Sequence, residues 1–539
     1  MSKKKRKDNF MIQAAILAAA GLISRIIGLL YGVPLYRIIG EEGNGYYATA
    51  YDIYFLILLI STYSIPIAVS KVISQRLAVN EYKNARKLFY CSMFYVLVVG
   101  SITAIITFIF APYWVVKPSV LALRVMAPTI FFSGLLSVFR GYMQAYNTMT
   151  PTAVSQIIEQ VINAVVSVVA AYFCSKPFRD VDSSLAASRG AAGSALGTGA
   201  GVLAGLSFIL LVYAKRKKDI DEKIALDNCT NEESYKDLFK VIFLMVTPVI
   251  LSTFIYNVST TIDMKIYWAV MNKNGIATKV AGANYGIYSR QFLVLINVPI
   301  AIASAVSSAL IPGISGAYGK NDITEVKNKL NQAIRTTMLI IIPATIGMSV
   351  LANPIMQLLF HGTTKSAANA LTAGSISILF YSLSTITNGV LQAIGKVVEP
   401  VKNATITLVI HVLFVYLMLE YTNGILSVLV AGSVIYSFLM CILNARSVRK
   451  YLDYKMDLKK IYIMPAIAAL AMGFVAYFVY KYLYMVIGSN ILCLAISIIV
   501  AATVYFVVIL KIGGYTEEDI KQLPKGTLIV RIAKKVNLM

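Results

Sequence analysis

The chain is poor in charged residues and in the residue types that build most catalytic or metal sites. Only 14% of its 539 residues are Asp, Glu, Lys or Arg, whereas soluble domains carry about 25%. Two histidines and five scattered cysteines, with no C-x-x-C pair, indicate neither a zinc site nor a disulfide framework. Walker, G-x-S-x-G and H-E-x-x-H motifs are also absent. These absences argue against a soluble enzyme.

Two D-x-D strings are the nearest approach to the motif of a metal-dependent sugar transferase, at Asp180–Asp182 and Asp219–Asp221. The first falls in a segment expected outside the cell, where nucleotide sugars are absent. The second lies in a loop too short to build a donor-binding fold. We therefore predict that the protein is not an enzyme. Without a Walker site, any energised transport must use an ion gradient or the membrane potential, unless a partner hydrolyses ATP.

Long apolar segments dominate the chain, which is 58% hydrophobic. A membrane-spanning helix needs about 20 predominantly apolar residues. Segments of that length occur fourteen times, near residues 10–37, 47–70, 88–111, 119–145, 152–174, 190–214, 238–269, 282–310, 334–352, 367–394, 400–420, 424–445, 461–483 and 489–510. The prediction is an all-α membrane protein with fourteen transmembrane helices.

The basic residues predict the orientation of these helices. With the amino terminus placed in the cytoplasm, 35 of the 49 Lys and Arg residues fall in cytoplasmic segments, as the positive-inside rule requires. The even number of spans then puts both termini in the cytoplasm. This distribution explains the net charge of +24 without a nucleic-acid partner, and it predicts contacts with anionic membrane lipids. The apolar run after the basic start is too long for a signal peptide, so we expect it to be a retained first helix.

An internal repeat predicts two lobes. GYMQAYNTMTP at 141–151 is similar to GVLQAIGKVVEP at 389–400, and a second pair relates 65–87 to 298–329. Two parallel lobes joined by a loop are typical of transporters, with the substrate between them. The predicted organisation is an N-terminal lobe at 1–214, a cytoplasmic linker at 215–237, a C-terminal lobe at 238–450, two extra helices at 451–511 and a cytoplasmic tail at 512–539.

Charged side chains inside the predicted spans mark candidate binding residues, because an ionisable group at membrane depth is costly. Arg25 lies in the middle of the first span and Arg290 in a span of the second lobe. If both face a central cavity, they form a cationic pocket suited to phosphate. Asp52 and Glu159 are candidates to pair with them in the empty state, although plain structural ion pairs explain these residues equally well. A purely structural role for Arg25 is the alternative.

Other polar residues carry weaker predictions. Arg124 and Arg140 lie near opposite ends of one span, which favours interface anchoring, although Arg140 also remains a candidate substrate ligand. A coupling site for Na⁺ or H⁺ is predicted at Asp263, Asn403 and Thr407, with a simple polar helix end as the alternative for Asp263. No resident cofactor is expected. His411 is expected to be a hydrogen-bonded core residue, and the glycines at every fourth position of 193–205 to form a close-packing face.

Three stretches resemble the polysaccharide-exporter branch of the MOP transporter superfamily. They are SRIIGLLYGVPLYRIIGEEGNGYY at 24–47, IPIAVSKVIS at 65–74 and, most specifically, RGYMQAYNTMTPTAVSQIIEQ at 140–160. Within that branch the chain resembles the lipid II flippases of the MurJ/YtgP type, with the stage V sporulation protein B type next. The resemblance implies fourteen helices, two lobes arranged as a V, and a central cationic cavity for the diphosphate of a lipid-linked precursor.

The resemblance also implies site residues and a function. Arg25 in S-R-x-x-G and Arg290 in Y-S-R-Q match cavity arginines of MurJ-like proteins, whereas Tyr31 stands where Gram-negative members carry a second arginine. The predicted function is a cell-membrane flippase that moves a lipid-linked diphosphate sugar, most simply lipid II, by alternating access, with cell-wall synthesis proteins as candidate partners. The alternatives are export of another lipid-linked oligosaccharide, a sporulation-type protein or scaffold, and multidrug export.

Overall fold

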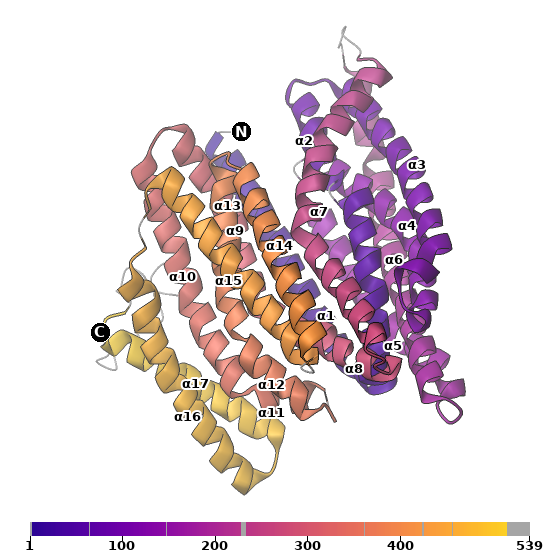
Figure 1. Cartoon of the computed structure of the whole chain (residues 1–539). Coiled ribbons are helices and arrows are strands. Elements are labelled where there is room, and N and C mark those ends of the chain that lie inside the picture. Colours follow the sequence, from indigo (N-terminus) through magenta and orange to yellow (C-terminus); the bar gives the residue numbers. More distant parts are fainter. Residues whose placement is uncertain are drawn as a thin grey trace. The chain divides into compact units, whose positions relative to one another are not determined.

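The computed structural model describes residues 3–514 except 64, 147, 228–232, 361, 423–424 and 455. These residues form helices joined by short turns, with no β-strand among them. An all-helical chain is what a bilayer requires, because a helix satisfies its own backbone hydrogen bonds. The prediction of an all-α membrane protein is therefore confirmed (Figure 1).

Eleven helices of the described residues are long and apolar enough to cross a membrane, or twelve if the bent pair Lys365–Gly374 and Ile376–Ala393 is one span. The predicted number of fourteen is not confirmed by this criterion and stays a prediction. One source of the difference is α1 (Lys3–Leu58), which covers two of the predicted spans. Gly40 breaks it with φ of 66° and ψ of −172°, a backbone conformation that is available essentially to glycine alone.

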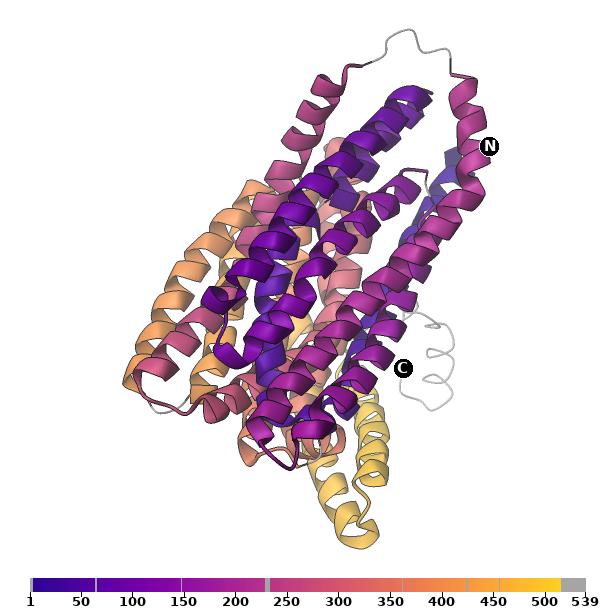
Figure 2. The same ribbon diagram turned by 90° about the vertical axis from the view of Figure 1, so that its right-hand side faces the viewer.

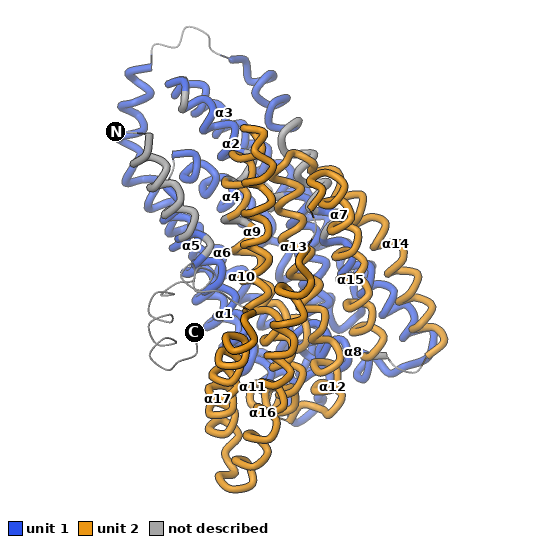
Figure 3. The backbone as a smooth tube through the Cα atoms, turned by 90° about the vertical axis from the view of Figure 1, so that its left-hand side faces the viewer, with its two compact units in different colours: residues 1–290 blue, residues 291–539 orange. Residues whose placement is uncertain are grey.

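The chain divides into two compact units, residues 1–290 and 291–539 (Figure 3). The main helices of the first unit are α1, α2 (Ile65–Ala78), α3 (Tyr82–Trp114), α4 (Val120–Ala145), α5 (Thr150–Ser175), α6 (Ser183–Ala225), α7 (Tyr235–Lys273) and α8 (Thr278–Gly286). A π-helical turn at Ile287–Phe292 follows α8. Helices α7 and α8 thus belong to the first unit. The lobe boundaries expected from the sequence stay a prediction.

The second unit is also all-helical in the residues described. It consists of α9 (Leu293–Gly319), α10 (Ile323–Val350), α11 (Ala352–Leu359), α12 (Lys365–Gly374), α13 (Ile376–Ala393), α14 (Val398–Tyr421), α15 (Ile425–Leu452), α16 (Met464–Ile487) and α17 (Asn490–Lys511). Helices α16 and α17, which pack against each other, are the pair predicted after the second lobe.

Both sequence repeats coincide with helix–turn–helix elements. The pair 141–151 and 389–400 covers the end of α4 and the start of α5 in one copy, and the end of α13 and the start of α14 in the other. In the second pair, the α2–α3 turn and the α9–α10 turn each contain an asparagine with positive φ, Asn80 at 62° and Asn321 at 57°. Left-handed asparagines at matching turns give the predicted repeat a backbone basis.

Helices α3 to α6 run alongside one another in the first unit (Figure 2). An apolar core joins α2, α3, α4, α6 and α7, with aromatic contacts such as Phe89 to Tyr142, whose ring centroids are 4.5 Å apart. Other faces of α3 expose large apolar side chains, among them Ile105, Phe108 and Ile109. In a membrane protein such a face is suited to contact lipid, because hydrocarbon replaces water around it.

The glycine face of α6 packs directly on α5, as predicted. A Cβ added at Gly193 would lie 2.5 Å from the Ala170 carbonyl oxygen, and one at Gly197 would lie 2.5 Å from the Ser167 amide nitrogen. A Cβ at Gly201 would lie 2.5 Å from the Glu159 carbonyl oxygen. Only glycine permits backbones to approach so closely, so this face determines where α5 holds Glu159.

Replacing Gly197 with leucine is expected to destabilise the first unit by about 2 kcal/mol, because overpacking at a helix contact forces backbone shifts. The measurement is thermal unfolding of the purified protein in detergent. Gly316→Leu is the matched control, since no atom lies within 4 Å of a Cβ at Gly316. Equal unfolding temperatures for the two variants would contradict close α5–α6 packing.

Candidate functional site

Arg290 lies in the π-helical turn after α8, surrounded by tyrosines from α1. Its guanidinium carbon is 4.7 Å from the centroid of the Tyr47 ring, which is within cation–π range. Its Nη2 donates a hydrogen bond of 3.4 Å to the Tyr31 hydroxyl. Single π-helical turns occur frequently at functional sites, and this one carries the arginine predicted from the sequence.

The tyrosines of α1 follow the helix repeat and form one aromatic face. The Tyr51 ring stacks 5.9 Å from Tyr47 and lies 5.8 Å from Tyr54. Two of the hydroxyls are tied to neighbouring helices: Tyr47 to Thr198 at 3.2 Å and Tyr54 to Ser133 at 3.5 Å. These contacts fix the Tyr47 ring against α6, so the Arg290 guanidinium meets a rigid partner.

Asp52 provides a carboxyl group beside this cluster. Its carboxylate accepts a short hydrogen bond from the Tyr285 hydroxyl, and it lies within electrostatic reach of both Arg290 and Asp263. The predicted association of Asp52 with Arg290 is therefore electrostatic in the structure, with Tyr285 as the direct hydrogen-bond partner. An anion that binds Arg290 would compete with Asp52 for the same positive charge.

Close backbone packing brings α1 and α8 together at this point. A Cβ at Gly45 would lie 1.9 Å from the Gly282 carbonyl oxygen, and one at Gly286 would lie 2.1 Å from the Glu41 carbonyl oxygen. Any side chain at Gly45 or Gly286 would push the helices apart. The glycines therefore hold Asp52 within hydrogen-bond distance of Tyr285.

Arg140 and Glu159 form an ion pair between α4 and α5. Arg140 Nη2 lies 2.8 Å from Glu159 Oε2, and Arg140 Nε donates to Ser155 Oγ at 2.9 Å. The side chains are only 13% and 22% exposed. Both charges are thus satisfied within the first unit, which favours the structural alternative for Glu159. Its electrostatic effect nonetheless reaches Tyr51 and Tyr54.

Arg25 lies on the first segment of α1 and is exposed. Its side chain makes no hydrogen bond or ion pair among the described residues, and a Cβ at Gly21 or Gly28 would meet no atom within 4 Å. This part of α1 is therefore sparsely packed, and the Arg25 guanidinium keeps all its donors available. A joint Arg25–Arg290 pocket stays a prediction.

The residues of the predicted coupling site belong to different units. Asp263 lies on α7, whereas Asn403 and Thr407 lie one turn apart on α14. Asn403 donates to Asn444 Oδ1 at 2.9 Å and to Ser447 Oγ at 3.0 Å, while the buried Thr407 hydroxyl has no partner among the described residues. A Na⁺ or H⁺ site that joins all three stays a prediction.

Several other sequence motifs have structural roles. Asp182 caps α6 by accepting hydrogen bonds from the Ser184 and Leu185 amides, and Asp221 forms a 3.5 Å ion pair with Arg86. The buried His411 ring lies 3.1 Å from the Gly432 carbonyl oxygen, which confirms the predicted core role. Within the described part of the chain, no three His, Cys, Asp or Glu residues gather as a metal would require.

The sequence interpretation missed the aromatic partners of Arg290. Tyr47 and Tyr51 are spaced by four residues next to Asp52, in the string YYATAYDIYF. That spacing puts them on one helix face, and tyrosines beside an intramembrane carboxylate are a signal that we could have used. Tyr285, five residues before Arg290, gave no such signal because its partner is far away in the sequence.

A family model described as lipid II flippase MurJ matches residues 76–496. Stage V sporulation protein B of Bacillus subtilis (strain 168) is 26% identical over 97% of this chain and its own full length. Lipid II flippase MurJ of the same organism is 27% identical over 87% of each chain. These relatives extend over most of the sequence, and the family match includes Arg140, Glu159 and Arg290.

A solved structure titled lipid II flippase MurJ, inward closed conformation, is similar to this fold. The TM-score is 0.66 at 16% sequence identity, and the match covers 91% of this chain and 97% of that one. At this identity the likeness concerns the fold. Together with the sequence matches, it supports the all-helical membrane architecture.

Proposed function

Because the chain belongs to the lipid II flippase MurJ family, we propose that it carries a lipid-linked diphosphate sugar, namely lipid II, from the inner to the outer leaflet. The relative of that name and the structural likeness place the chain among multi-pass transporters of the cell membrane, in the context of peptidoglycan synthesis. The identity of the cargo and the direction of transport are the parts that we propose.

The proposal rests mainly on the hydrogen-bond donors of Arg290 that the described side chains leave unused. An arginine has five N–H donors, and the described side chains take only one long bond from this guanidinium, to Tyr31. The remaining donors suit the oxygens of a diphosphate, which a planar guanidinium binds in bidentate fashion. Asp52 supplies an internal carboxyl group within electrostatic reach of Arg290, which the incoming diphosphate would replace.

In the proposed mechanism, two lobes alternate between inward-open and outward-open states around this cation. Arg25, exposed and without a partner among the described residues, contributes the second positive charge to the diphosphate clamp. The prenyl tail stays in the lipid, because moving it through a polar chamber would cost its hydrophobic stabilisation. Downhill movement of Na⁺ or H⁺, coupled through binding at Asp263, Asn403 and Thr407, would supply the driving force.

The orientation and partners follow from the same proposal. Both termini lie in the cytoplasm, as the basic segments predict, so the lipid II headgroup enters from the side on which it is made. Anionic lipids surround the basic loops, and enzymes that consume lipid II outside the membrane are the partners to seek. Multidrug export is disfavoured, since cationic drugs require an acidic site and Arg290 is positive.

Direct translocation in proteoliposomes tests the proposal. Fluorescent lipid II in the outer leaflet of sealed vesicles is exposed to a membrane-impermeant quencher, and movement between leaflets is followed as a change in the quenchable fraction. We expect movement of lipid II with the protein and none with empty vesicles. Movement of an oligosaccharide linked to the same prenyl diphosphate at an equal rate would reassign the cargo, and no movement of either would refute transport.

A sporulation role is the second candidate, because the match to stage V sporulation protein B covers that protein's entire length. Under this alternative the chain acts during spore formation and not in growth. Complementation distinguishes the two: rescue of growth in cells depleted of their own lipid II flippase supports the general role. Rescue only of a sporulation defect in cells that lack stage V sporulation protein B supports the second.

A further inference from the structure

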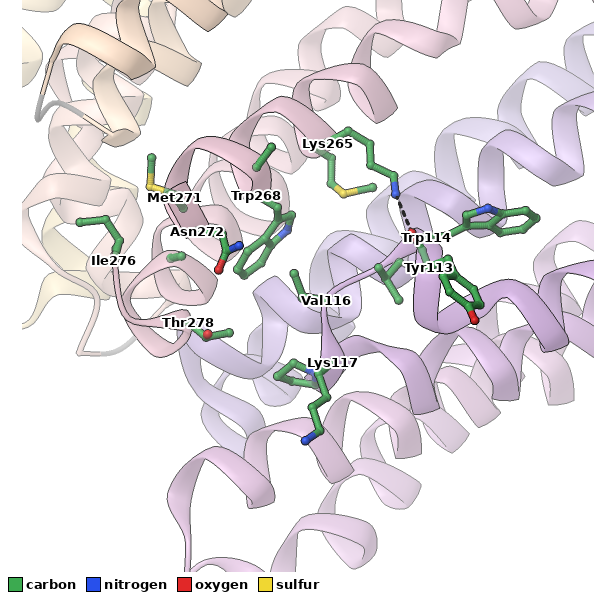
Figure 4. Close-up of a pocket in the computed structure, with 15 residues that line it drawn as sticks. Tyr113, Trp114, Val116, Lys117, Lys265, Trp268, Met271, Asn272, Ile276 and Thr278 are labelled. Carbon is green, nitrogen blue, oxygen red and sulfur yellow. Dashed lines mark hydrogen bonds between the residues drawn. The ribbon is translucent and has the colours of Figure 1, made fainter. Parts of the chain in front are cut away.

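A pocket of about 460 Å³ lies in the first unit, and none of the candidate site residues considered above lines it (Figure 4). The end of α3 and the turn that follows it form one wall, and α7 with the start of α8 forms the other. Its volume is within the range of small-molecule sites. Since helix ends meet here, the pocket belongs to the interface region of a membrane-spanning unit and not to its apolar middle.

The charge of the pocket has one sign. Lys117 and Lys265 line it, and none of its fifteen described lining residues is Asp or Glu. Lys265 Nζ donates to the Tyr113 carbonyl oxygen at 3.5 Å, which leaves two of its three N–H donors. The Lys117 side chain forms no hydrogen bond or ion pair among the described residues. An anion is therefore the ligand that these side chains favour.

Three aromatic side chains also contribute to the recognition surface. Trp114, Tyr113 and Trp268 line the pocket together with the amide of Asn272. Tryptophan, tyrosine and lysine are the residues that sit at the headgroup level of a bilayer. Trp114 ends α3, whose exposed Ile105, Phe108 and Ile109 form an apolar face one to two turns away. A ligand here would thus have an anionic head beside the pocket and hydrocarbon beside α3.

We propose that this pocket binds the phosphate of an anionic membrane lipid, with Lys265 on the phosphate and Trp114 and Trp268 against the glycerol and upper chain. Lys117, whose nitrogen points away from that of Lys265 (Figure 4), adds positive charge at the other edge of the pocket. With the amino terminus in the cytoplasm, the lipid belongs to the outer leaflet. The site is independent of the transport proposal, because no residue of the Arg290 cluster lines it.

Trp268 connects the lipid site to the Arg290 cluster. Its Nε1 donates to Thr49 Oγ1 at 3.0 Å, and its ring centroid is 6.4 Å from that of Tyr285, the partner of Asp52. Trp268 therefore lies between the pocket and the residue that holds the Asp52 carboxyl group.

The two tryptophans of the pocket are the only ones in the chain, so tryptophan fluorescence, excited selectively over the tyrosines, reports on this site alone. The full-length protein is reconstituted with brominated phosphatidylglycerol or with brominated phosphatidylcholine of the same chains, and quenching is measured against mole fraction. We expect phosphatidylglycerol to bind at least about tenfold more tightly, since each lysine near a surface contributes to anionic lipid binding. Equal quenching by the two lipids would overturn the proposal.

Variants test the assignment to the lysines. Lys117→Gln with Lys265→Gln is expected to abolish the preference for phosphatidylglycerol, whereas Lys279→Gln should leave it unchanged. Lys279 is the matched control because it is exposed, lies next to the lining residue Thr278 and does not line the pocket. A preference that survives the double change would refute the site.

A further experiment distinguishes binding of a lipid from binding of a free anion. Inorganic phosphate is titrated into the detergent-solubilised protein, with Trp emission as the signal. We expect no saturable change, because phosphate alone lacks the contacts to the aromatic rings. Saturation that is lost in the Lys117→Gln, Lys265→Gln variant would mean that the pocket binds phosphate itself, and the lipid assignment would be wrong. Since none of these arms measures lipid II movement, the transport proposal is tested separately.

Discussion

Replacing Arg290 with glutamine is expected to lower the rate of lipid II translocation by roughly 30- to 150-fold, equivalent to about 2 to 3 kcal/mol for a lost charge-assisted contact. Glutamine keeps a polar side chain but removes the positive charge over Tyr47 and the forked donors. It also leaves Asp52 without its nearby cation. The rate is measured in proteoliposomes at equal protein content, with reconstituted protein quantified for each variant.

Two further variants make this result specific. Arg290→Lys should retain only part of the activity, because a lysine keeps the charge and cannot bind a diphosphate bidentately. Arg124→Gln is the matched control: Arg124 is also an arginine within a span, and its guanidinium carbon lies 5.4 Å from the centroid of the Phe108 ring. If Arg124→Gln and Arg290→Gln slow transport equally, the clamp is refuted.

The Arg140–Glu159 pair is expected to contribute mainly to stability. Replacing Glu159 with leucine leaves a largely buried guanidinium without its carboxylate, and removing one partner of a buried pair costs about 3 kcal/mol or more. The single change Arg140→Met should destabilise to a similar degree, because it strands Glu159. The measurement is the unfolding free energy of each purified variant in mixed micelles with increasing denaturing detergent.

The double variant Arg140→Met, Glu159→Leu distinguishes stability from substrate binding. With both charges removed, apolar side chains of similar volume fill the space between α4 and α5, and such replacements are often neutral. We expect stability close to that of the unaltered protein together with substantial translocation. A stable double variant that no longer moves lipid II would instead show that Arg140 binds the substrate, which is the alternative that the sequence also predicts for this residue.

Much of the fold could be predicted because the bilayer restricts the possible structures. An apolar run of about 20 residues has little choice but to form a helix in hydrocarbon. The fourteen predicted segments accordingly fall on helices of the structure, although α1 joins two of them across Gly40. The close-packing face of the glycines at 193, 197 and 201 could also be predicted, since their spacing alone puts them on one side of a helix.

The site could be predicted only in part. Arg290 was identified because a charged side chain in an apolar span is costly and therefore marks a binding or pairing role. The family resemblance also matches this residue to a cavity arginine. Its partners come from residues about 240 to 260 positions earlier, at Tyr31 and Tyr47, so no local pattern joins them. Glu159 illustrates the same limit, because the sequence is equally compatible with an ion pair to Arg140 and with an ion pair to a cavity arginine.

The sequence by itself determined that this is a helical membrane protein of one transporter family, because hydropathy, the distribution of basic residues and family motifs are all local features of the chain. Only the tertiary structure decided which charges meet. Backbone contact between Gly45 and Gly282 holds Asp52 at Tyr285, and the α4–α5 packing joins Glu159 to Arg140. Electrostatic pairing depends on separations of a few ångströms, and such separations are set by how helices pack.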